Sequence, residues 1–245
     1  MRLILLPEAR IAGLLAGEGA SGPLLPPCAV SLGAFDGLHL GHQSLVRAVH
    51  AARERRGLAA TALFTFRHHP RAVVAPASAP RLLTTWREKL GLLAGLGVDA
   101  VVAADFCPAL AQTPYDVFVQ RFLLDLLGMR HFVVGHDVHL GAGRGGNEAT
   151  LAALARRLGF GFEAIPPLAV GARLVSSSAI RNLLAGGDMA GARALLGRPY
   201  GVWGEVGSGD GRGVTIGFPT ANLQPLEPFK LLPAPGVYAV RVLAP

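Results

Sequence analysis

Short apolar runs alternate with longer amphipathic stretches through most of the chain. The runs have the length of buried strands, and the stretches between them repeat apolar residues with the period of a helix. The predicted strands are residues 29–32, 59–65, 98–103, 131–134 and 162–165. Because strands that alternate with helices of about ten to fifteen residues form βαβ units, the sequence predicts a parallel sheet.

Capping signals mark where several helices should begin. Residues 85–88, Thr-Trp-Arg-Glu, have the spacing of a capping box and predict a helix toward Gly95. Thr113 and Pro114 supply an N-cap and a first-turn proline for a helix through Leu127. The other helices of this part are predicted over residues 41–56 and 147–158.

The pattern changes after Gly186 and Gly187, which end a predicted helix. Asp188 is placed to cap a short helix that runs to Leu196. Farther on, the chain is rich in glycine and proline, as at the beginning of a small antiparallel barrel. Its short β-like pieces are residues 202–206, 214–216 and 237–243.

We therefore expect an α/β protein of two units. A Rossmann-like parallel-sheet domain covers residues 1–187, and a partial antiparallel β-barrel covers residues 188–245. In parallel sheets the ligand sits at the carboxyl ends of the strands, where loops lead into helices. The loops to search are those after Leu32, Thr65, Val134 and Val175.

Composition narrows the class of protein. Hydrophobic residues make up 51% of the chain and charged residues 16%, which excludes an extended disordered protein. No window holds the ~20 uninterrupted apolar residues of a membrane-spanning helix, and the apolar start is interrupted at Pro7 and Glu8, too early for a signal peptide. Cys28 and Cys107 stand alone, which favours reduced thiols over a disulfide framework or a zinc site. We therefore expect a cytoplasmic protein with no membrane partner.

The net charge of +7 is almost entirely arginine, since Lys89 and Lys230 are the only lysines. The arginines are dispersed, and their densest groups fall at residues 53–56 and 156–157. Both groups lie late in predicted helices, where cations complement the helix dipole. Aromatic platforms on which bases could stack are also missing. The sequence therefore predicts no nucleic-acid partner.

The most informative stretch is Gly-Ala-Phe-Asp-Gly-Leu-His-Leu-Gly-His at residues 33–42, between a predicted strand and a predicted helix. A helix N-terminus binds anions because its N–H groups are unpaired and its dipole end is positive. Gly41 lets a phosphate approach the backbone, and the imidazoles of His39 and His42 can donate hydrogen bonds to phosphate oxygens. The pattern favours phosphoryl or nucleotidyl transfer. An HxxH pair alone would also fit surface histidines or part of a metal site.

This stretch resembles the HxGH nucleotidyltransferases, and its lead-in is similar to that of the FAD synthetase family, the prokaryotic bifunctional riboflavin kinase/FMN adenylyltransferases. The resemblance implies an adenylyltransferase in which His39 and His42 stabilise the transferring phosphate and the leaving group. It also implies that the same loop binds ATP, through Gly33, Ala34, Phe35, Asp36 and Gly41.

Two further segments are similar to segments of that family that are associated with flavin binding. Residues 64–70, Phe-Thr-Phe-Arg-His-His-Pro, are similar to a segment that normally ends in Pro-His-Pro, and His68 replaces the first of these prolines. Residues 135–141 are similar to a Gly-x-Asp-Phe-x-Phe-Gly segment, with Val138 and Leu140 in place of the phenylalanines. The flavin-binding residues that this resemblance implies are Phe66, His69, Pro70 and Asp137.

The region after the fourth of these predicted strands offers two other interpretations. His136, Asp137 and His139 could be metal ligands, but such a short-spaced trio lacks a fourth partner. Residues 141–146 fit GxGxxG, with Glu163 at a distance suited to a ribose contact. That fingerprint should follow a strand directly, and here another segment intervenes, so a dinucleotide site is not predicted.

Ser176, Ser177, Ser178 and Arg181 form a second candidate phosphate site. Serines at a helix start cap it and present hydroxyl and N–H groups to an anion, and an arginine one turn later can bind a triphosphate. An ordinary capped helix with a surface arginine would show the same pattern. The segment is similar to the family's Ser-Ser-Thr-x-Ile-Arg, which implies that the serines bind ATP and that Arg181 takes part in catalysis.

Residues 211–223 resemble the riboflavin kinase signature of the same family. The resemblance implies that Thr220 and Asn222 help to hold Mg²⁺ and the phosphates of ATP, and hydroxyl and amide oxygens suit that ion. The sequence stops before the family's catalytic glutamate and leaves few strands to close a barrel. We therefore expect little or no conversion of riboflavin to FMN.

The leading prediction is an FMN adenylyltransferase with ATP and FMN as substrates and Mg²⁺ implied by the chemistry. FMN as the acceptor rests on the resemblance alone. One alternative is an HxGH transferase that acts on a sugar-alcohol or pantetheine phosphate, and another is a non-catalytic flavin- or nucleotide-binding protein. The oligomeric state stays open.

Overall fold

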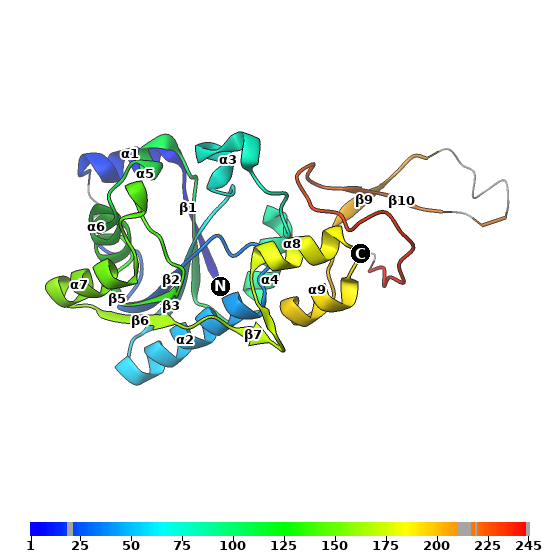
Figure 1. Ribbon diagram of the computed structural model, residues 1–245. Helices are drawn as coiled ribbons and strands as arrows, with labels where there is room; N and C mark the ends of the chain where they lie inside the picture. The colour runs from blue at the N-terminus through cyan, green and yellow to red at the C-terminus, as the bar shows by residue number, and fades with distance from the viewer. Residues whose placement is uncertain (19–21, 210–216, 219, 244–245) are drawn as a thin grey trace.

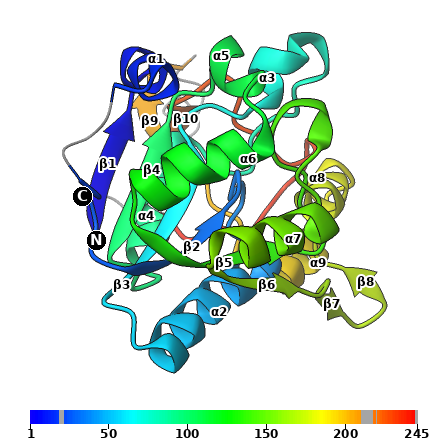
Figure 2. The same ribbon diagram turned by 90° about the vertical axis from the view of Figure 1, so that its left-hand side faces the viewer.

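The computed structural model describes residues 1–18, 22–209, 217–218 and 220–243. Its centre is a six-stranded sheet with the order β1-β4-β3-β2-β5-β6, in which all neighbouring strands are parallel. The strands are β1 (Arg2–Leu6), β2 (Cys28–Leu32), β3 (Ala60–Phe66), β4 (Ala100–Ala104), β5 (Met129–Gly135) and β6 (Gly161–Ile165). Helices lie on both faces of this sheet (Figure 1, Figure 2). The predicted α/β fold with a parallel sheet is confirmed.

The two faces of the sheet bury separate cores. On β3, the side chains of Phe64 and Phe66 join the first core, whereas that of Leu63 joins the second. This alternation follows from the period of two along a strand. Every residue of β3 and of β4 is buried, which explains why these segments read as nearly continuous apolar runs.

The helices divide between the two cores. The first core is covered by α1 (Glu8–Ala16), α5 (Pro108–Ala111), α6 (Tyr115–Phe118), the π-helical segment η2 (Val119–Asp125) and α7 (Glu148–Leu158). The second core is covered by α2 (Leu40–Arg56) and α4 (Trp86–Ala94). Short helical turns α3 (Arg71–Val74), η1 (Pro76–Ser78) and η3 (Ala142–Arg144) lie in the connections. None of the helices in the described ranges has the length and apolar character needed to cross a membrane.

Beyond β6 the chain forms a small third core. Its elements are β7 (Ala169–Val170), β8 (Arg173–Leu174), α8 (Ser177–Ala185) and α9 (Met189–Leu196). The two strands pair in an antiparallel hairpin, and α9 packs against α8. Leu83, from the loop before α4, is fully buried in this core together with Ile180 and Leu196. The third core therefore joins the segment before α4 to the helices that follow the sheet (Figure 1).

After α9, the described residues contain one two-stranded antiparallel sheet, β9 (Gly204–Gly207) with β10 (Asn222–Pro225). This sheet extends to the right of α8 and α9 in Figure 1. β9 overlaps the strand predicted at residues 202–206, and the piece predicted at residues 214–216 lies outside the described residues. A small antiparallel sheet thus follows the parallel one, as the sequence predicts.

Two local predictions differ from the structure, and one strand was not predicted. Thr113 does not cap a helix, because its hydroxyl donates to the Ala109 carbonyl oxygen (2.8 Å) and Pro114 is the N-cap residue of α6. Residues 237–243 form no strand, and the valines among them are exposed. β1 was not predicted from the sequence, and it forms the edge of the sheet beside β4.

Candidate functional site

The sheet order reverses between β2 and β5. From β2 the chain continues into β3 and β4 on one side, whereas β5 and β6 lie on the other side. In open parallel sheets the ligand binds outside the carboxyl ends of the strands at such a switch point. The loop of residues 33–39 after β2 and the loop of residues 136–140 after β5 therefore flank the candidate site.

The backbone of the loop after β2 is unusual. Phe35 and Leu38 have φ angles of 49° and 38°, although neither is glycine and both are buried. Gly37 has a φ of 83°, and a Cβ there would lie 2.7 Å from Cδ1 of Leu83, so this position requires glycine. Non-glycine residues in this region store strain of about 1–3 kcal/mol each, and such strain is concentrated at functional sites.

His39 and His42 lie together at the start of α2. His39 is the N-cap residue, and its Nδ1 accepts a hydrogen bond from the backbone N–H of His42 (3.3 Å). The two imidazole rings stack with their centroids 3.7 Å apart and their planes 15° from parallel. The Phe35 ring meets the His42 ring edge-on at 5.3 Å. A Cβ on Gly41 would lie 3.2 Å from ring atoms of His39, so the glycine makes room for this imidazole.

Burial keeps both histidines neutral at pH 7. It lowers the pKa of His39 to about 4, although the carboxylates of Asp36 and Asp137 act in the opposite direction. It also lowers the pKa of His42 well below its ordinary value, and the positive charges of His39, when that imidazole is protonated, and of Lys89 act in the same direction. Since Nδ1 of neutral His39 accepts a hydrogen bond, its proton is on Nε2, which makes that atom a donor.

Replacing His39 by asparagine is expected to make the stability of the protein less sensitive to acid. The pKa of His39 in the native state is about 4, below the value of about 6.5 in the unfolded chain. The unfolded state therefore binds the proton first, and stability falls as the pH drops from 6.5 toward 4. Urea unfolding at pH 7 and pH 5 should show that the wild type loses about 2 kcal/mol more than the variant. Equal losses in the two proteins would contradict a buried, neutral His39.

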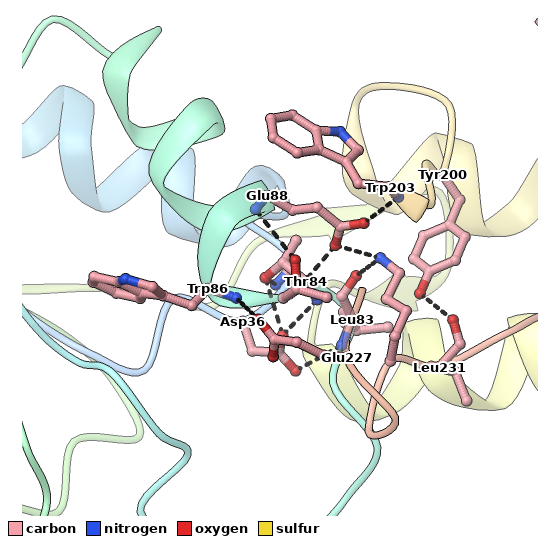
Figure 3. A network of polar contacts seen from close by, with 12 residues as sticks. Asp36, Leu83, Thr84, Trp86, Glu88, Tyr200, Trp203, Glu227 and Leu231 are labelled. Atoms are coloured by element: carbon pink, nitrogen blue, oxygen red, sulfur yellow. Dashed lines mark hydrogen bonds and ion pairs between the residues drawn. The ribbon is translucent and has the colours of Figure 1, made fainter. Parts of the chain in front are cut away.

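Asp36 is buried, and both oxygens of its carboxylate accept hydrogen bonds from the protein (Figure 3). Oδ1 accepts from the N–H (2.9 Å) and the hydroxyl (3.1 Å) of Thr84. Oδ2 accepts from the N–H of Leu83 (3.1 Å) and from the guanidinium of Arg181. Asp36 therefore fastens the loop after β2 to the segment before α4. A direct contact of this carboxylate with ATP stays a prediction.

Arg181 and the serines at the start of α8 lie against the same loop. Nε of Arg181 donates to the carbonyl oxygen of Arg81 (2.9 Å), in addition to the bond with Asp36. The hydroxyl of Ser177 donates to the carbonyl oxygen of Asp36 (3.0 Å), and Ser176 caps α8 through a backbone N–H of its first turn. The starts of α2 and α8 are therefore close together, and neither first turn carries an acidic side chain.

Comparison with known proteins places this chain in a family. The family model for FAD synthetase matches residues 23–179, and the family model for riboflavin kinase matches residues 196–245. The chain belongs to the bifunctional riboflavin kinase/FMN adenylyltransferase family.

Individual relatives agree with this family. The bifunctional riboflavin kinase/FMN adenylyltransferase of Haemophilus influenzae is 37% identical over 229 residues, which cover 94% of this chain and 73% of that protein. The protein of the same name from Escherichia coli K12 is 37% identical over 216 residues, which cover 88% and 68% of the two chains. A solved structure described as a macrolide-efflux protein from Streptococcus pneumoniae superposes with a TM-score of 0.80 and 28% identity, over 96% of this chain and 73% of that one.

In this member of the bifunctional family, Lys89 is a buried cation that the sequence did not mark as functional. From α4, its Nζ donates to the carbonyl oxygens of Ala34 and Phe66, each at 3.0 Å. It therefore joins the loops that follow β2 and β3. Burial lowers the pKa of Lys89 to about 8. The only local signal near it is the capping box of Thr85 and Glu88, which fixes where α4 begins.

The residues that the resemblance implies for flavin binding lie in two places in the structure. Phe66, His69 and Pro70 line one depression, together with Asp36 and the side of α4. Burial lowers the pKa of His69. Asp137 lies instead in the loop after β5, where it is exposed and close enough to His39 to affect its pKa. The structure thus brings the first three residues together and places Asp137 across the switch point.

The residues implied by the kinase signature lie apart from this site. Thr220 and Asn222 are both exposed, and Asn222 begins β10, which Figure 1 shows well away from the parallel sheet. Within the described part of the chain, no group of three or more His, Cys, Asp or Glu side chains is placed to hold a metal ion. His136, Asp137 and His139 are therefore not assembled as a metal centre.

Proposed function

We propose that this chain is an FMN adenylyltransferase, which transfers AMP from ATP to the phosphate of FMN and yields FAD and pyrophosphate. The observation that carries the proposal is the stacked pair of His39 and His42 at the N-terminus of α2, at the switch point of the parallel sheet. Membership of the bifunctional family supports FMN as the acceptor.

The phosphates of ATP are proposed to bind where α2 and α8 begin. Each helix start presents N–H groups and the positive end of its dipole, and no acidic side chain of the first turn opposes this charge. The backbone of Gly33, Ala34 and Phe35 leads to the first of these sites. At the second, the exposed hydroxyl of Ser178 is available to a phosphate oxygen.

In the transfer step, an oxygen of the FMN phosphate attacks the α-phosphorus of ATP. The new P–O bond forms while the bond from the α-phosphorus to the oxygen that bridges to the β-phosphorus breaks. The electron pair of the broken bond leaves with pyrophosphate. Neutral His39 donates its Nε2–H to the phosphate where negative charge shifts, and His42 supports it from the stacked position.

Arg181 is proposed to contribute to the same charge stabilisation. Its guanidinium has five N–H donors, and the bonds to Asp36 and to the Arg81 carbonyl engage only two of its nitrogens. Because Asp36 holds one side of the guanidinium, the orientation of Arg181 is fixed before ATP binds. A fixed donor loses little entropy when the transition state forms.

Mg²⁺ stays a prediction for this chain. Mg²⁺ sites in proteins use one or two carboxylates together with substrate phosphates. Here the carboxylate of Asp36 is engaged by protein donors, and Thr220 and Asn222 lie on the exposed C-terminal segment. The described residues do not form a preassembled site for the ion, and no step is derived through it.

Riboflavin kinase activity is the second candidate function, because residues 196–245 match that family. In the described part of this segment the strands form one two-stranded sheet, on which Val206 and Leu223 are exposed. A two-stranded sheet is only marginally stable by itself. We therefore propose that the 245 residues make little or no FMN from riboflavin.

Pyrophosphate release from ATP with a panel of acceptors tests the proposed function. We expect release with FMN, accompanied by FAD, and none with riboflavin, pantetheine phosphate or a sugar-alcohol phosphate. Faster release with one of the non-flavin phosphates would favour a different HxGH transferase. If a folded protein binds FMN and ATP without release, a non-catalytic binding function replaces the proposal.

A further inference from the structure

The segment that matches the riboflavin kinase family buries one charged side chain against the parallel-sheet part of the molecule. The side chain of Lys230 is 1% exposed and pairs with Glu88 of α4, with Nζ 2.6 Å from Oε2. Its Nζ also donates to the carbonyl oxygen of Leu83 (2.7 Å) and lies 4.5 Å from the centre of the Tyr200 ring. Figure 3 shows these three partners, Glu88, Leu83 and Tyr200, close together between α4 and the C-terminal chain.

Backbone hydrogen bonds continue the contact on both sides of Lys230. The N–H of Leu82 donates to the carbonyl oxygen of Phe229 (2.8 Å), and the N–H of Leu231 donates to the carbonyl oxygen of Leu82 (2.8 Å). Leu82 and Lys230 thus pair like residues of neighbouring parallel strands. The C-terminal chain is therefore fixed in register against the segment before α4.

The backbone of Leu83 is held on both sides of its Cα. Its carbonyl oxygen accepts from Lys230, and its N–H donates to Oδ2 of Asp36. Thr84 completes the link, because its N–H and its hydroxyl both donate to Oδ1 of Asp36. Asp36 in turn accepts from Arg181. A continuous set of direct hydrogen bonds therefore runs from Lys230 to the loop that ends at His39.

Arg198 makes a second contact from the same segment to that loop. Its Nη2 donates to the carbonyl oxygen of Gly37 (2.8 Å), and its Nη1 donates to that of Leu38 (3.3 Å). These two residues directly precede His39, and both have positive φ angles. The segment thus supports the strained loop at two separate places.

We propose that Lys230 is a positioning residue for adenylyl transfer, which fixes the segment of residues 82–84 and, through Asp36, the placement of His39 and Arg181. This inference rests on the proposed function. A buried ion pair adds little net stability compared with apolar residues of similar volume, so stability alone does not account for Lys230. Its two hydrogen bonds are directional, whereas apolar contacts are not. A displacement of about 1 Å at reacting groups lowers rates by about 10²-fold.

The test compares Lys230→Met and the double variant Glu88→Gln/Lys230→Met with the wild type, each as the full chain. Lys230→Met leaves the carboxylate of Glu88 buried without its partner and is expected to destabilise the protein. The double variant removes both charges and is expected to fold. In it, kcat for FAD formation should fall by about tenfold or more, while KM for ATP stays within about threefold. Tyr238→Phe is the matched control, since it removes a hydrogen bond (2.6 Å) inside the same segment and should leave kcat unchanged.

Amide hydrogen exchange gives a readout that does not depend on activity. In the wild type, the amides of Leu83, Thr84 and Leu231 should exchange through the same local unfolding event, and should therefore show the same free energy of opening. In the double variant, the amides of Leu83 and Thr84 should exchange about ten times faster or more.

If the amide of Leu231 exchanged in the wild type with a free energy of opening different from that of Leu83 and Thr84, the proposal would be overturned. A folded double variant with wild-type kcat and wild-type exchange at Leu83 and Thr84 would also overturn it. If the wild type made no FAD, the proposed function would fail, and faster exchange at Leu83 in the double variant would still support the link from Lys230 to Asp36.

Discussion

Replacing His39 by asparagine should lower kcat for FAD formation by about 10²–10³-fold without a comparable loss of stability at pH 7. Asparagine is a good N-cap residue, so it can accept the bond from the N–H of His42 that Nδ1 of His39 accepts in the native protein. The variant lacks the Nε2–H donor beside the transferring phosphate. Steady-state rates of FAD formation and a urea unfolding curve, both at pH 7, measure the two parts of this expectation.

His50→Asn on the same helix is the matched control. His50 lies about three turns from His39, and its Nε2 is 3.0 Å from the carbonyl oxygen of Leu96. This substitution removes an imidazole from α2 and should leave kcat unchanged. Wild-type kcat in His39→Asn would contradict a direct role of the imidazole. An equal loss in both variants would mean that the effect comes from the folding of α2.

Replacing Asp36 by alanine should destabilise the protein by about 3–5 kcal/mol and abolish measurable FAD formation. The variant leaves the N–H groups of Leu83 and Thr84 and the charge of Arg181 without their buried acceptor. The loop after β2 then loses its attachment to the segment before α4. Urea unfolding at pH 7 measures the change in stability, and FAD formation well below the unfolding midpoint measures the loss of activity.

Asp99→Ala is the control for a carboxylate that anchors backbone elsewhere. Asp99 accepts two hydrogen bonds from Thr61, each 2.8 Å, at the amino ends of β3 and β4. Its side chain is 46% exposed, so the loss of stability should be smaller than for Asp36. We expect Asp99→Ala to keep wild-type kcat. An Asp36→Ala protein that also kept wild-type kcat would show that the anchored loop does not matter for catalysis.

The elements that the sequence predicted best are those with local signals. α4 begins at the capping box of Thr85 and Glu88, and both of its hydrogen bonds are present. α9 begins at Asp188, whose side chain accepts from the N–H of Gly191 (2.7 Å). β1 carries no such signal, because three of its five residues are exposed and it is defined by pairing with β4, far along the chain.

The site was predictable where its residues are neighbours in sequence. His39 and His42 are one helical turn apart, and the structure stacks their rings. The partners of Asp36 were not predictable in this way, since Thr84 lies 48 residues away and Arg181 lies 145 residues away. Only the tertiary fold brings these groups to one carboxylate.

The roles of the two lysines were also not predictable from the sequence. In the sequence, Lys89 and Lys230 are single charges without a motif. In the structure both are buried: Lys89 donates to the carbonyl oxygens of Ala34 and Phe66, and Lys230 donates to that of Leu83. Their roles depend on which carbonyl oxygens the packing of α4 and of the C-terminal chain leaves within reach, and no local pattern encodes that.

The α-phosphorus of ATP is the atom to follow in the most direct test of adenylyl transfer to FMN. ATP labelled in its α-phosphate is incubated with FMN and the purified 245-residue protein, and the flavins and phosphates are then separated. We expect the label to appear in FAD, with one unlabelled pyrophosphate released for each FAD formed. A folded protein that yields no labelled flavin, or that releases the label only as ADP, would contradict adenylyl transfer to FMN.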